Sequence, residues 1–282
     1  MHANFISTML KFVLTSNYFI KLKMALIAPQ YNDHKFINKL RLINTRIFYL
    51  IFGCSLLPIV IQYFPAVSRF ATIVNIVNIT SLIAYFALDF IIEYHLYPLA
   101  EDARKVDFID NSWGTKNSLQ NSVLYYDNDE LKYGLYKMAS NLFQNVFFSY
   151  NVSRAMRKSK YGLNIMFTII ILIIACYGFN NVPIAIPLLQ VVFSSVILGD
   201  LLKHIVLINR LKQVLEKWQG LFQDEEFKDN PDKYRAQVYS IWLYYESTLA
   251  RTQVSLSEDK FNELNQKLTH DWFEIKKKYL IN

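Results

Sequence analysis

The chain has 282 residues, of which 53% are hydrophobic and 19% charged, and its formal net charge is +7. This composition is too apolar for a disordered protein or an ordinary soluble globule and fits a chain partly immersed in a membrane. Only 7 glycines are present, which argues against a glycine-rich phosphate-binding loop. The 2 cysteines do not predict a structural disulfide.

The N-terminal segment, residues 1–46, is predicted to be cytosolic or interfacial. Its first part is moderately apolar but carries a lysine and lacks a small-residue cleavage site, so it fits an interfacial helix better than a signal peptide. Translation could start at Met1 or at Met24. The spacing of apolar residues over Asp33–Arg46 predicts a helix that continues into the membrane.

Four apolar segments follow, each close to the roughly 20 residues that a helix needs to cross a bilayer. They pair into two transmembrane hairpins, 47–92 and 162–208, and predict an all-α polytopic membrane protein. A cytosolic connector, 93–161, and a helical cytosolic tail, 209–282, complete the chain. The four segments are Ile47–Phe64, Ala71–Ile92, Gly162–Phe179 and Val182–Ile208.

Lysine and arginine are concentrated on one side of these spans. The N-terminal segment, the connector and the tail are rich in them, whereas the two short links within the hairpins hold only Arg69. Basic segments favour the cytoplasmic side, so both termini and the connector are predicted to be cytosolic. The net positive charge reflects this bias and is not by itself evidence for nucleic-acid binding.

The cytosolic segments show helical signals of their own. The connector predicts a long helix from Asp129 to Lys158, and Pro98 is expected to kink or restart the helix that leaves span two. In the tail, Ser255–Glu258 has the pattern of a capping box before a final helix. That helix is predicted to bury one face formed by Phe261, Leu264, Leu268, Trp272 and Ile275.

Span two carries a polar stripe at helical spacing, formed by Asn75, Asn78, Tyr85 and Asp89 with Leu82 between them. Polar groups are costly in hydrocarbon and face protein or water. One interpretation is a pore-lining face with Asp89 near its cytosolic mouth. The other, of equal weight, is hydrogen bonding between packed helices.

Span four carries Asp200 and His204 one helical turn apart. A proton-coupled site is one interpretation, but a charge cluster that satisfies itself at the inner end of the span is favoured. Asp89 and Asp200 are the one pair that fits a protease dyad. No serine-hydrolase, zinc-protease, CxxC or Walker motif is present. The chain is therefore predicted not to be an enzyme and to have no catalytic residue, metal site or cofactor.

The connector begins with DARKVDFIDNSWGT, which concentrates charged, amide and aromatic side chains in a short segment. Ligand sensing or gating is one interpretation, and hydrogen bonding between connector and tail is equally supported. A hard-cation site at the aspartates is a weaker hypothesis, and zinc is disfavoured because no His or Cys lies in the segment. The candidate sensing residues are Arg104, Lys105, Asp107, Asp110, Asn111 and Trp113.

The layout of two hairpins, a cytosolic connector, a helical tail and no enzyme motif resembles bacterial four-transmembrane pore-forming effectors of the SMODS-associated four-helix type. DARKVDFIDNSWGT and the downstream YYDNDELKYGLYKMASNLFQNVFFSYNV are similar to the connector of such proteins, including the Hailong type. The resemblance covers most of the chain after about Asp33. It implies an antiphage effector encoded beside a nucleotidyltransferase and controlled by a nucleotide-derived signal. In the Hailong type that signal is a DNA oligomer that keeps the effector inactive.

Together these observations predict a homo-oligomeric pore, expected to be a tetramer, in the bacterial inner membrane. Its partners would be the lipid bilayer, further copies of the chain, and a nucleotide or DNA-oligomer ligand made by a partner nucleotidyltransferase. Opening would depolarise the membrane and stop growth of the infected cell, as in abortive infection. The alternatives are a non-conducting scaffold and a small transporter. Pro58 and Pro187 do not lie in corresponding spans, which counts against the transporter.

Overall fold

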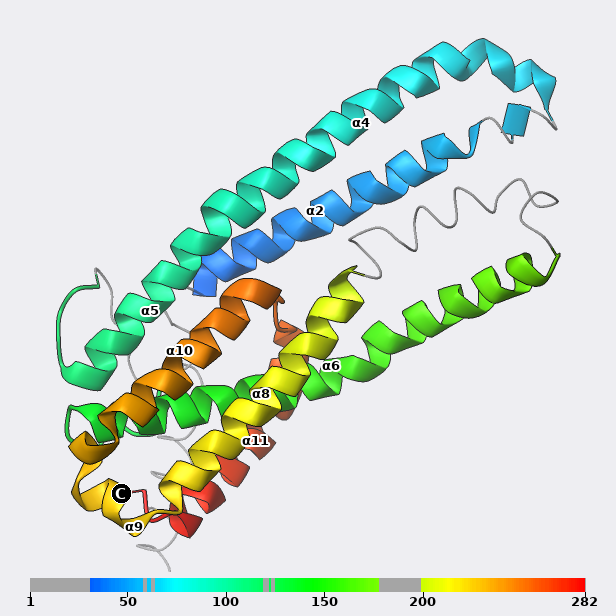
Figure 1. Ribbon diagram of the computed structural model, residues 1–282. Coiled ribbons are helices and arrows are strands. Elements are labelled where there is room, and N and C mark those ends of the chain that lie inside the picture. The colour runs from blue at the N-terminus through cyan, green and yellow to red at the C-terminus, as the bar shows by residue number, and fades with distance from the viewer. Residues whose placement is uncertain are drawn as a thin grey trace, which may run out of the picture.

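The computed structural model describes residues 31–57, 60–61, 64–118, 122, 125–177 and 199–281. The expectations for Met1, Met24, Pro58, Pro187 and most of span four therefore lie outside the described residues. Within the described part the protein is all-helical and has no strand, as predicted (Figure 1). In chain order the elements are α2 (Tyr31–Ser55), η1 (Pro65–Phe70), α4 (Ala71–Ile91), η2 (Ile92–Leu96), α5 (Tyr97–Trp113), α6 (Leu135–Tyr177), α8 (Asp200–Phe222), α9 (Glu225–Asp229), η5 (Pro231–Tyr234), α10 (Arg235–Thr252) and α11 (Glu258–Lys278).

The first predicted hairpin is present as the antiparallel pair α2 and α4, which are joined through the 3-10 helix η1 (Figure 1). Asn44 of α2 donates a hydrogen bond to Asp89 of α4 at 3.3 Å. Phe48 and Tyr85 pack with ring centroids 6.0 Å apart. Pro65 lies in the first turn of η1, where its missing N–H removes no helical hydrogen bond.

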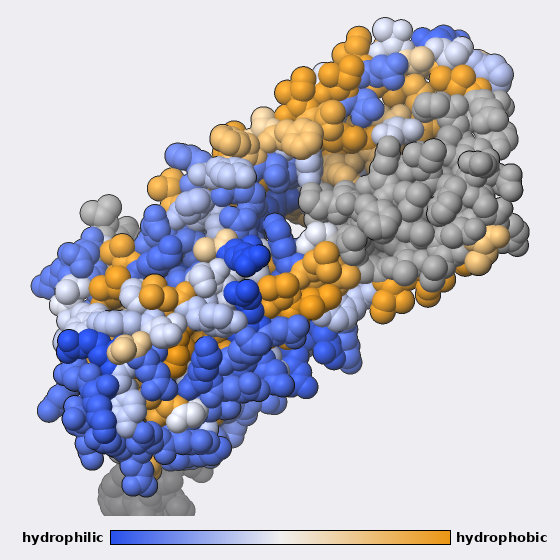
Figure 2. Space-filling model, in the orientation of Figure 1, coloured by the Kyte–Doolittle hydropathy of each residue, from blue (hydrophilic) through white to orange (hydrophobic). Residues whose placement is uncertain are grey.

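The helical rod from Pro65 to Trp113 is long and apolar enough to cross a membrane, with a mean hydropathy of 1.8 in its apolar window. In the core helix of a soluble protein most of such a window would be buried, whereas none of this window is buried in the protein. Figure 2 shows hydrophobic residues gathered along α4, which we call the apolar arm, and hydrophilic residues over the opposite end of the molecule. The described residues contain this one candidate span, so the other three spans stay predictions.

The rod passes from α4 into α5 through the π-helical turn η2. Pro98 has no N–H to donate to the carbonyl four residues earlier, so regular α-helical bonding is interrupted there. The N–H of Tyr97 instead bonds the carbonyl of Ile92, five residues back. The break expected near Pro98 therefore takes the form of a π-turn within a continuous rod.

Helix α6 begins later than predicted. The prediction of a helix start at Asp129 is wrong, because residues 127–130 form a turn and α6 starts at Leu135. Gly134 has φ of 137°, which is not helical, and its N–H bonds the carbonyl of Ser112 at 2.9 Å. Beyond Lys158, α6 continues unbroken to Tyr177 through most of the expected third span. Among the side chains described there, Ile165, Met166, Ile169 and Ile173 are exposed.

The main hydrophobic core lies among α5, α6, α8, α10 and α11. Phe143 of α6, Trp218 of α8 and Trp272 of α11 are fully buried. The rings of Phe143 and Trp272 meet edge to face with centroids 5.3 Å apart. The predicted stripe of α11 is confirmed, because Leu268 and Trp272 are buried and its other members pack against this core.

The start of α11 differs from the predicted capping box. Ser257, and not Ser255, is the N-cap and accepts a hydrogen bond from the N–H of Lys260 at 3.3 Å. Ser255 is engaged elsewhere, because it accepts a hydrogen bond from the guanidinium of Arg41 in α2. A tertiary contact thus replaces the local one that the pattern predicted.

Candidate ligand-binding cavity

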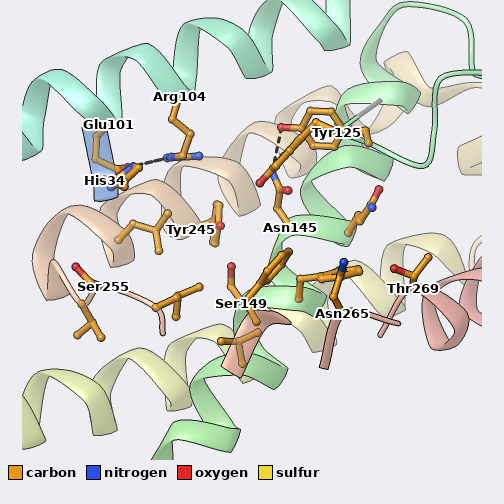
Figure 3. A pocket seen from close by; sticks show the side chains of 18 of the residues that line it. His34, Glu101, Arg104, Tyr125, Asn145, Ser149, Tyr245, Ser255, Asn265 and Thr269 are labelled. Atoms are coloured by element: carbon orange, nitrogen blue, oxygen red, sulfur yellow. Dashed lines mark hydrogen bonds and ion pairs between the residues drawn. The ribbon is translucent and has the colours of Figure 1, made fainter. Parts of the chain in front are cut away.

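A cavity of about 360 Å³ lies where the first hairpin meets the C-terminal helices (Figure 3). Its wall is formed by the N-terminal part of α2, by α5, by the turn at 125–127, by α6, by the end of α10, by the loop at 254–256 and by α11. This volume falls in the range of small-molecule sites. Segments far apart in the sequence therefore close one site at the base of the apolar arm.

Arg104 of α5 is held between two carboxylates in the cavity wall. Its Nη2 lies 3.0 Å from Oε2 of Glu101 and 2.5 Å from Oε2 of Glu246 on α10. Burial opposes the charge of Arg104, but the attraction of Glu246 and Glu101 outweighs it and raises the pKa of Arg104 above its ordinary value. The guanidinium of Arg104 is therefore protonated, and its positive charge is balanced by the carboxylates of Glu101 and Glu246.

His34 of α2 approaches the same cluster, with Nε2 3.5 Å from Oε1 of Glu101. Burial lowers the pKa of His34, and this effect outweighs the attraction of Glu101. The imidazole is therefore largely neutral near pH 7. Two turns further along α2, Arg41 donates to Glu93 at 2.7 Å and also to Ser255. The N-terminal half of α2 is thus tied to both the π-turn and the loop between α10 and α11.

Tyrosines supply the aromatic part of the cavity. Burial raises the pKa of Tyr125, Tyr126 and Tyr245, so their phenols stay protonated. The rings of Tyr125 and Tyr126 meet edge to face at 4.8 Å between centroids. The hydroxyl of Tyr126 accepts a hydrogen bond from Nδ2 of Asn145 at 3.3 Å. The rings are held in place and present apolar surface beside polar edges.

Neutral polar side chains occupy the part of the wall formed by α11 and α2. Asn265 and Thr269 lie one helical turn apart on α11, and Asn38 lies one turn from His34 on α2. Figure 3 shows Asn265 and Thr269 beside the cavity. In the part of the chain that the structure describes, the side chains of Asn38, Asn265 and Thr269 have no hydrogen-bond partner within the protein. Their donors and acceptors are therefore available to a ligand.

Of the six predicted sensing residues, Arg104 lines this cavity and the other five do not. Lys105 pairs at 3.2 Å with a neighbouring aspartate at the surface. Asn111 accepts a hydrogen bond from Nδ2 of Asn141 at 2.8 Å. Trp113 is partly exposed at the C-terminal end of α5, beside the turn that precedes α6.

Asp107 and Asp110 hold the loop that follows α5. Asp110 accepts hydrogen bonds of 2.6–3.1 Å from amides and side chains within 115–118. Burial alone would raise the pKa of Asp110, but these hydrogen bonds outweigh it and hold the pKa well below its ordinary value. Asp107 accepts from the N–H and the hydroxyl of Ser122 at 2.7 Å. The described residues contain no group of three metal-ligating side chains, so a cation site here gains no support.

The polar stripe of span two lies in two environments. At the end of the stripe next to η2, Tyr85 and Asp89 face α2 through the contacts with Phe48 and Asn44. Towards the η1 turn, Asn78 is partly buried and Asn75 is exposed in the single chain. The end next to η2 therefore agrees with hydrogen bonding between helices, and pore lining stays a prediction.

Asp200 and His204 bond partners on α6. Asp200 lies 2.5 Å from Nζ of Lys160, and Nε2 of His204 lies 3.0 Å from the carbonyl oxygen of Ser153. Both contacts join α8 to α6. The charge at the inner end of the predicted span is thus satisfied between helices, and not along one helix as the spacing indicates.

The cavity residues of α11 were not predicted as functional. In the sequence, Asn265 and Thr269 directly follow Leu264 and Leu268 of the apolar stripe, so their positions on the helix are visible from the sequence alone. Nothing local distinguishes them from the solvated polar residues of the same helix. Their place in the cavity depends on how α11 packs against α6 and on the approach of α2.

Comparison of the chain with protein-family models, with curated proteins and with solved structures finds no match.

Proposed function

We propose that this chain is an oligomeric pore-forming membrane effector, gated through its cytosolic helices by a nucleotide-derived signal. The observation that carries the proposal is the position of the cavity. Helix α2 belongs to the apolar hairpin and α5 continues its other helix, α4. Both α2 and α5 contribute to the cavity wall together with α6, α10 and α11. A ligand bound there touches the hairpin and the cytosolic core at the same time.

Coupling between ligand and hairpin follows from this shared wall. A ligand shifts a conformational equilibrium only by its difference in affinity for the two states. If α2 and α5 move relative to α10 and α11 when the pore opens, the cavity changes shape and its affinity changes with it. The contacts of Arg41 with Ser255 and of Arg104 with Glu246 span this boundary. They are the bonds that such a movement would break or remake.

Assembly of several copies is supported by the exposed polar group on the hairpin. Asn75 is exposed among the exposed apolar residues Ile73, Ile76 and Ile79. An amide that faces lipid is costly, so Asn75 is better placed against a neighbouring copy or a water-filled path. Four spans in one chain are too few for a roomy pore, and cyclic symmetry would supply the rest. Membrane insertion with cytosolic termini agrees with the distribution of basic residues.

The experiment is measurement of membrane potential by dye in bacterial cells that express the chain alone. We expect rapid depolarisation that Asn75→Leu and Asp89→Leu suppress while the protein still reaches the membrane. Thr80→Val is the matched control, because Thr80 lies on the opposite side of α4 at 3.6 residues per turn. This control should depolarise cells like the unaltered chain.

One result would count against the polar stripe, and another against the pore itself. Depolarisation that is unchanged by Asn75→Leu and Asp89→Leu would remove the stripe from the conducting path. Absence of depolarisation, with the chain confirmed in the membrane and with the partner genes either present or absent, would favour a non-conducting scaffold.

A further inference from the structure

The charges around the cavity limit the kind of group that it accepts. Apart from tyrosines, whose phenols stay protonated, the ionisable side chains in its wall are Arg104, Glu101, Asp127 and His34. His34 is largely neutral near pH 7, so the wall carries one cation and two carboxylates, and Glu246 adds a third carboxylate next to Arg104. The site is therefore not electropositive, although the chain as a whole is.

Arg104 is poorly placed to serve as a phosphate-binding residue. It is the predicted sensing residue that reaches the cavity, but both Glu101 and Glu246 already bind its guanidinium. A phosphate could take Arg104 only by leaving two largely buried carboxylates without their cation, which is strongly unfavourable. Among nearby cations, Arg41 is bound by Glu93 and Ser255, and Lys276 donates to Glu130 and to the carbonyl of Asp127.

The groups that are available suit an uncharged planar ligand. The amides of Asn38 and Asn265 each offer a donor and an acceptor, and Thr269 adds a hydroxyl. Such pairs match the hydrogen-bonding edge of a nucleobase. The rings of Tyr125 and Tyr245 lie in the same wall and provide apolar surface for a flat ring.

We infer that the cavity binds a nucleobase, the uncharged planar part of its ligand, and leaves the phosphates outside. This inference rests on the proposed function for the nucleotide nature of the signal. The amides of α2 and α11 read the edge of the base, and the ion cluster around Arg104 forms a fixed wall that excludes anions. The ligand is therefore recognised by its base and not by its charge.

The test compares nucleosides with nucleotides on the full chain in detergent micelles by titration calorimetry. The probes are deoxyadenosine, deoxyguanosine, deoxycytidine and thymidine, the 5′-monophosphate of each, and inorganic phosphate alone. We expect at least one nucleoside to bind, its monophosphate to bind no more tightly, and phosphate alone not to bind. Nucleoside affinity should stay constant between about 50 and 200 mM salt, a range over which phosphate contacts weaken strongly.

Variants of α11 connect this binding to the cavity. Asn265→Ala with Thr269→Ala should weaken nucleoside binding at least about tenfold, because both changes remove hydrogen bonds to the base. The matched control is Asn262→Ala with Gln266→Ala, two exposed polar residues of the same helix, which should bind like the unaltered chain. The unfolding temperature of both variants without ligand verifies that they are folded.

Three results would overturn the inference. They are failure of every nucleoside to bind, a monophosphate that binds more than about tenfold tighter with steep salt dependence, and a nucleoside affinity that the α11 variant leaves unchanged. The membrane-potential experiment separates this failure from failure of the pore. Depolarisation without nucleoside binding would support the pore and contradict base recognition. Nucleoside binding without depolarisation would contradict the pore and support the binding site.

Discussion

Arg104 and Glu246 lie 142 positions apart in the chain and form an ion pair with Nη2 and Oε2 2.5 Å apart. The pair ties α5, the extension of the apolar hairpin, to α10 of the C-terminal core. The side chains of Arg104 and Glu246 are 16% and 13% exposed. An ion pair that is so largely withdrawn from water is costly to leave half-formed.

Replacement of Arg104 by methionine is expected to destabilise the protein by about 3–5 kcal/mol, because Glu101 and Glu246 would stay buried without their cation. The measurement is thermal or denaturant unfolding in detergent. Lys105→Met is the matched control. Its partner is an exposed aspartate, so the change should stay within about 1 kcal/mol. Equal effects of the two substitutions would contradict the role of Arg104.

Acid should weaken the loop after α5 through Asp110. Its folded pKa lies below the unfolded value of about 3.9, so its contribution to stability is present above that pH. The contribution is lost as the pH falls through the folded value. Asp110→Asn should therefore cost about 1–3 kcal/mol at pH 7. It should also show a smaller further loss below about pH 4 than the unaltered chain does.

Unfolding measured from neutral pH downwards tests this dependence. Asp102→Asn serves as the control, because Asp102 is 70% exposed and bonds one lysine at the surface. It should follow the pH profile of the unaltered chain. A profile of Asp110→Asn parallel to that of the unaltered chain would show that other groups cause the acid loss.

Gly114 is required by the turn that ends α5. It has φ of 70°, and a Cβ added there would lie 2.8 Å from Cδ2 of the Tyr133 ring. Gly114→Ala is therefore expected to destabilise the protein by at least about 1 kcal/mol. Gly220→Ala in α8 is the contrasting case, because a Cβ meets nothing within 4 Å there. It should stabilise the helix by about 0.5–1 kcal/mol. Unfolding midpoints that shift in the same direction for both would contradict the argument.

The orientation of the hairpin is tested by labelling in intact cells. In a chain with Cys54 and Cys176 replaced by alanine, Ser68→Cys places a thiol in the exposed η1 turn. A membrane-impermeant maleimide should label it from outside. Lys267→Cys on α11 should react only after permeabilisation, because the tail is predicted to be cytosolic. The reverse pattern would invert the topology, and labelling of both would argue against a membrane barrier between them.

Local patterns predicted those parts of the fold that depend on neighbouring residues. The apolar face of α11 follows from periodicity, because Leu268 and Trp272 lie one turn apart on a single helix. The pairing of α2 with α4 follows from two apolar segments joined by a short proline-led turn. The pattern failed where distant groups intervene, as at Ser255, whose hydroxyl is taken by Arg41, and at Gly134, which bonds Ser112.

Residue composition and helical spacing were enough to predict an all-helical fold, one hairpin of adjacent helices and a concentration of charge away from the apolar segments, because each of these features depends on local pattern. The cavity, in contrast, depends on tertiary packing. Packing puts His34 and Asn265 into one wall and brings Glu246 to the Arg104–Glu101 pair of α5, from a segment more than a hundred residues away. Whether an arginine receives a ligand or is neutralised depends on which carboxylates packing brings within about 3 Å, and no local spacing carries that information.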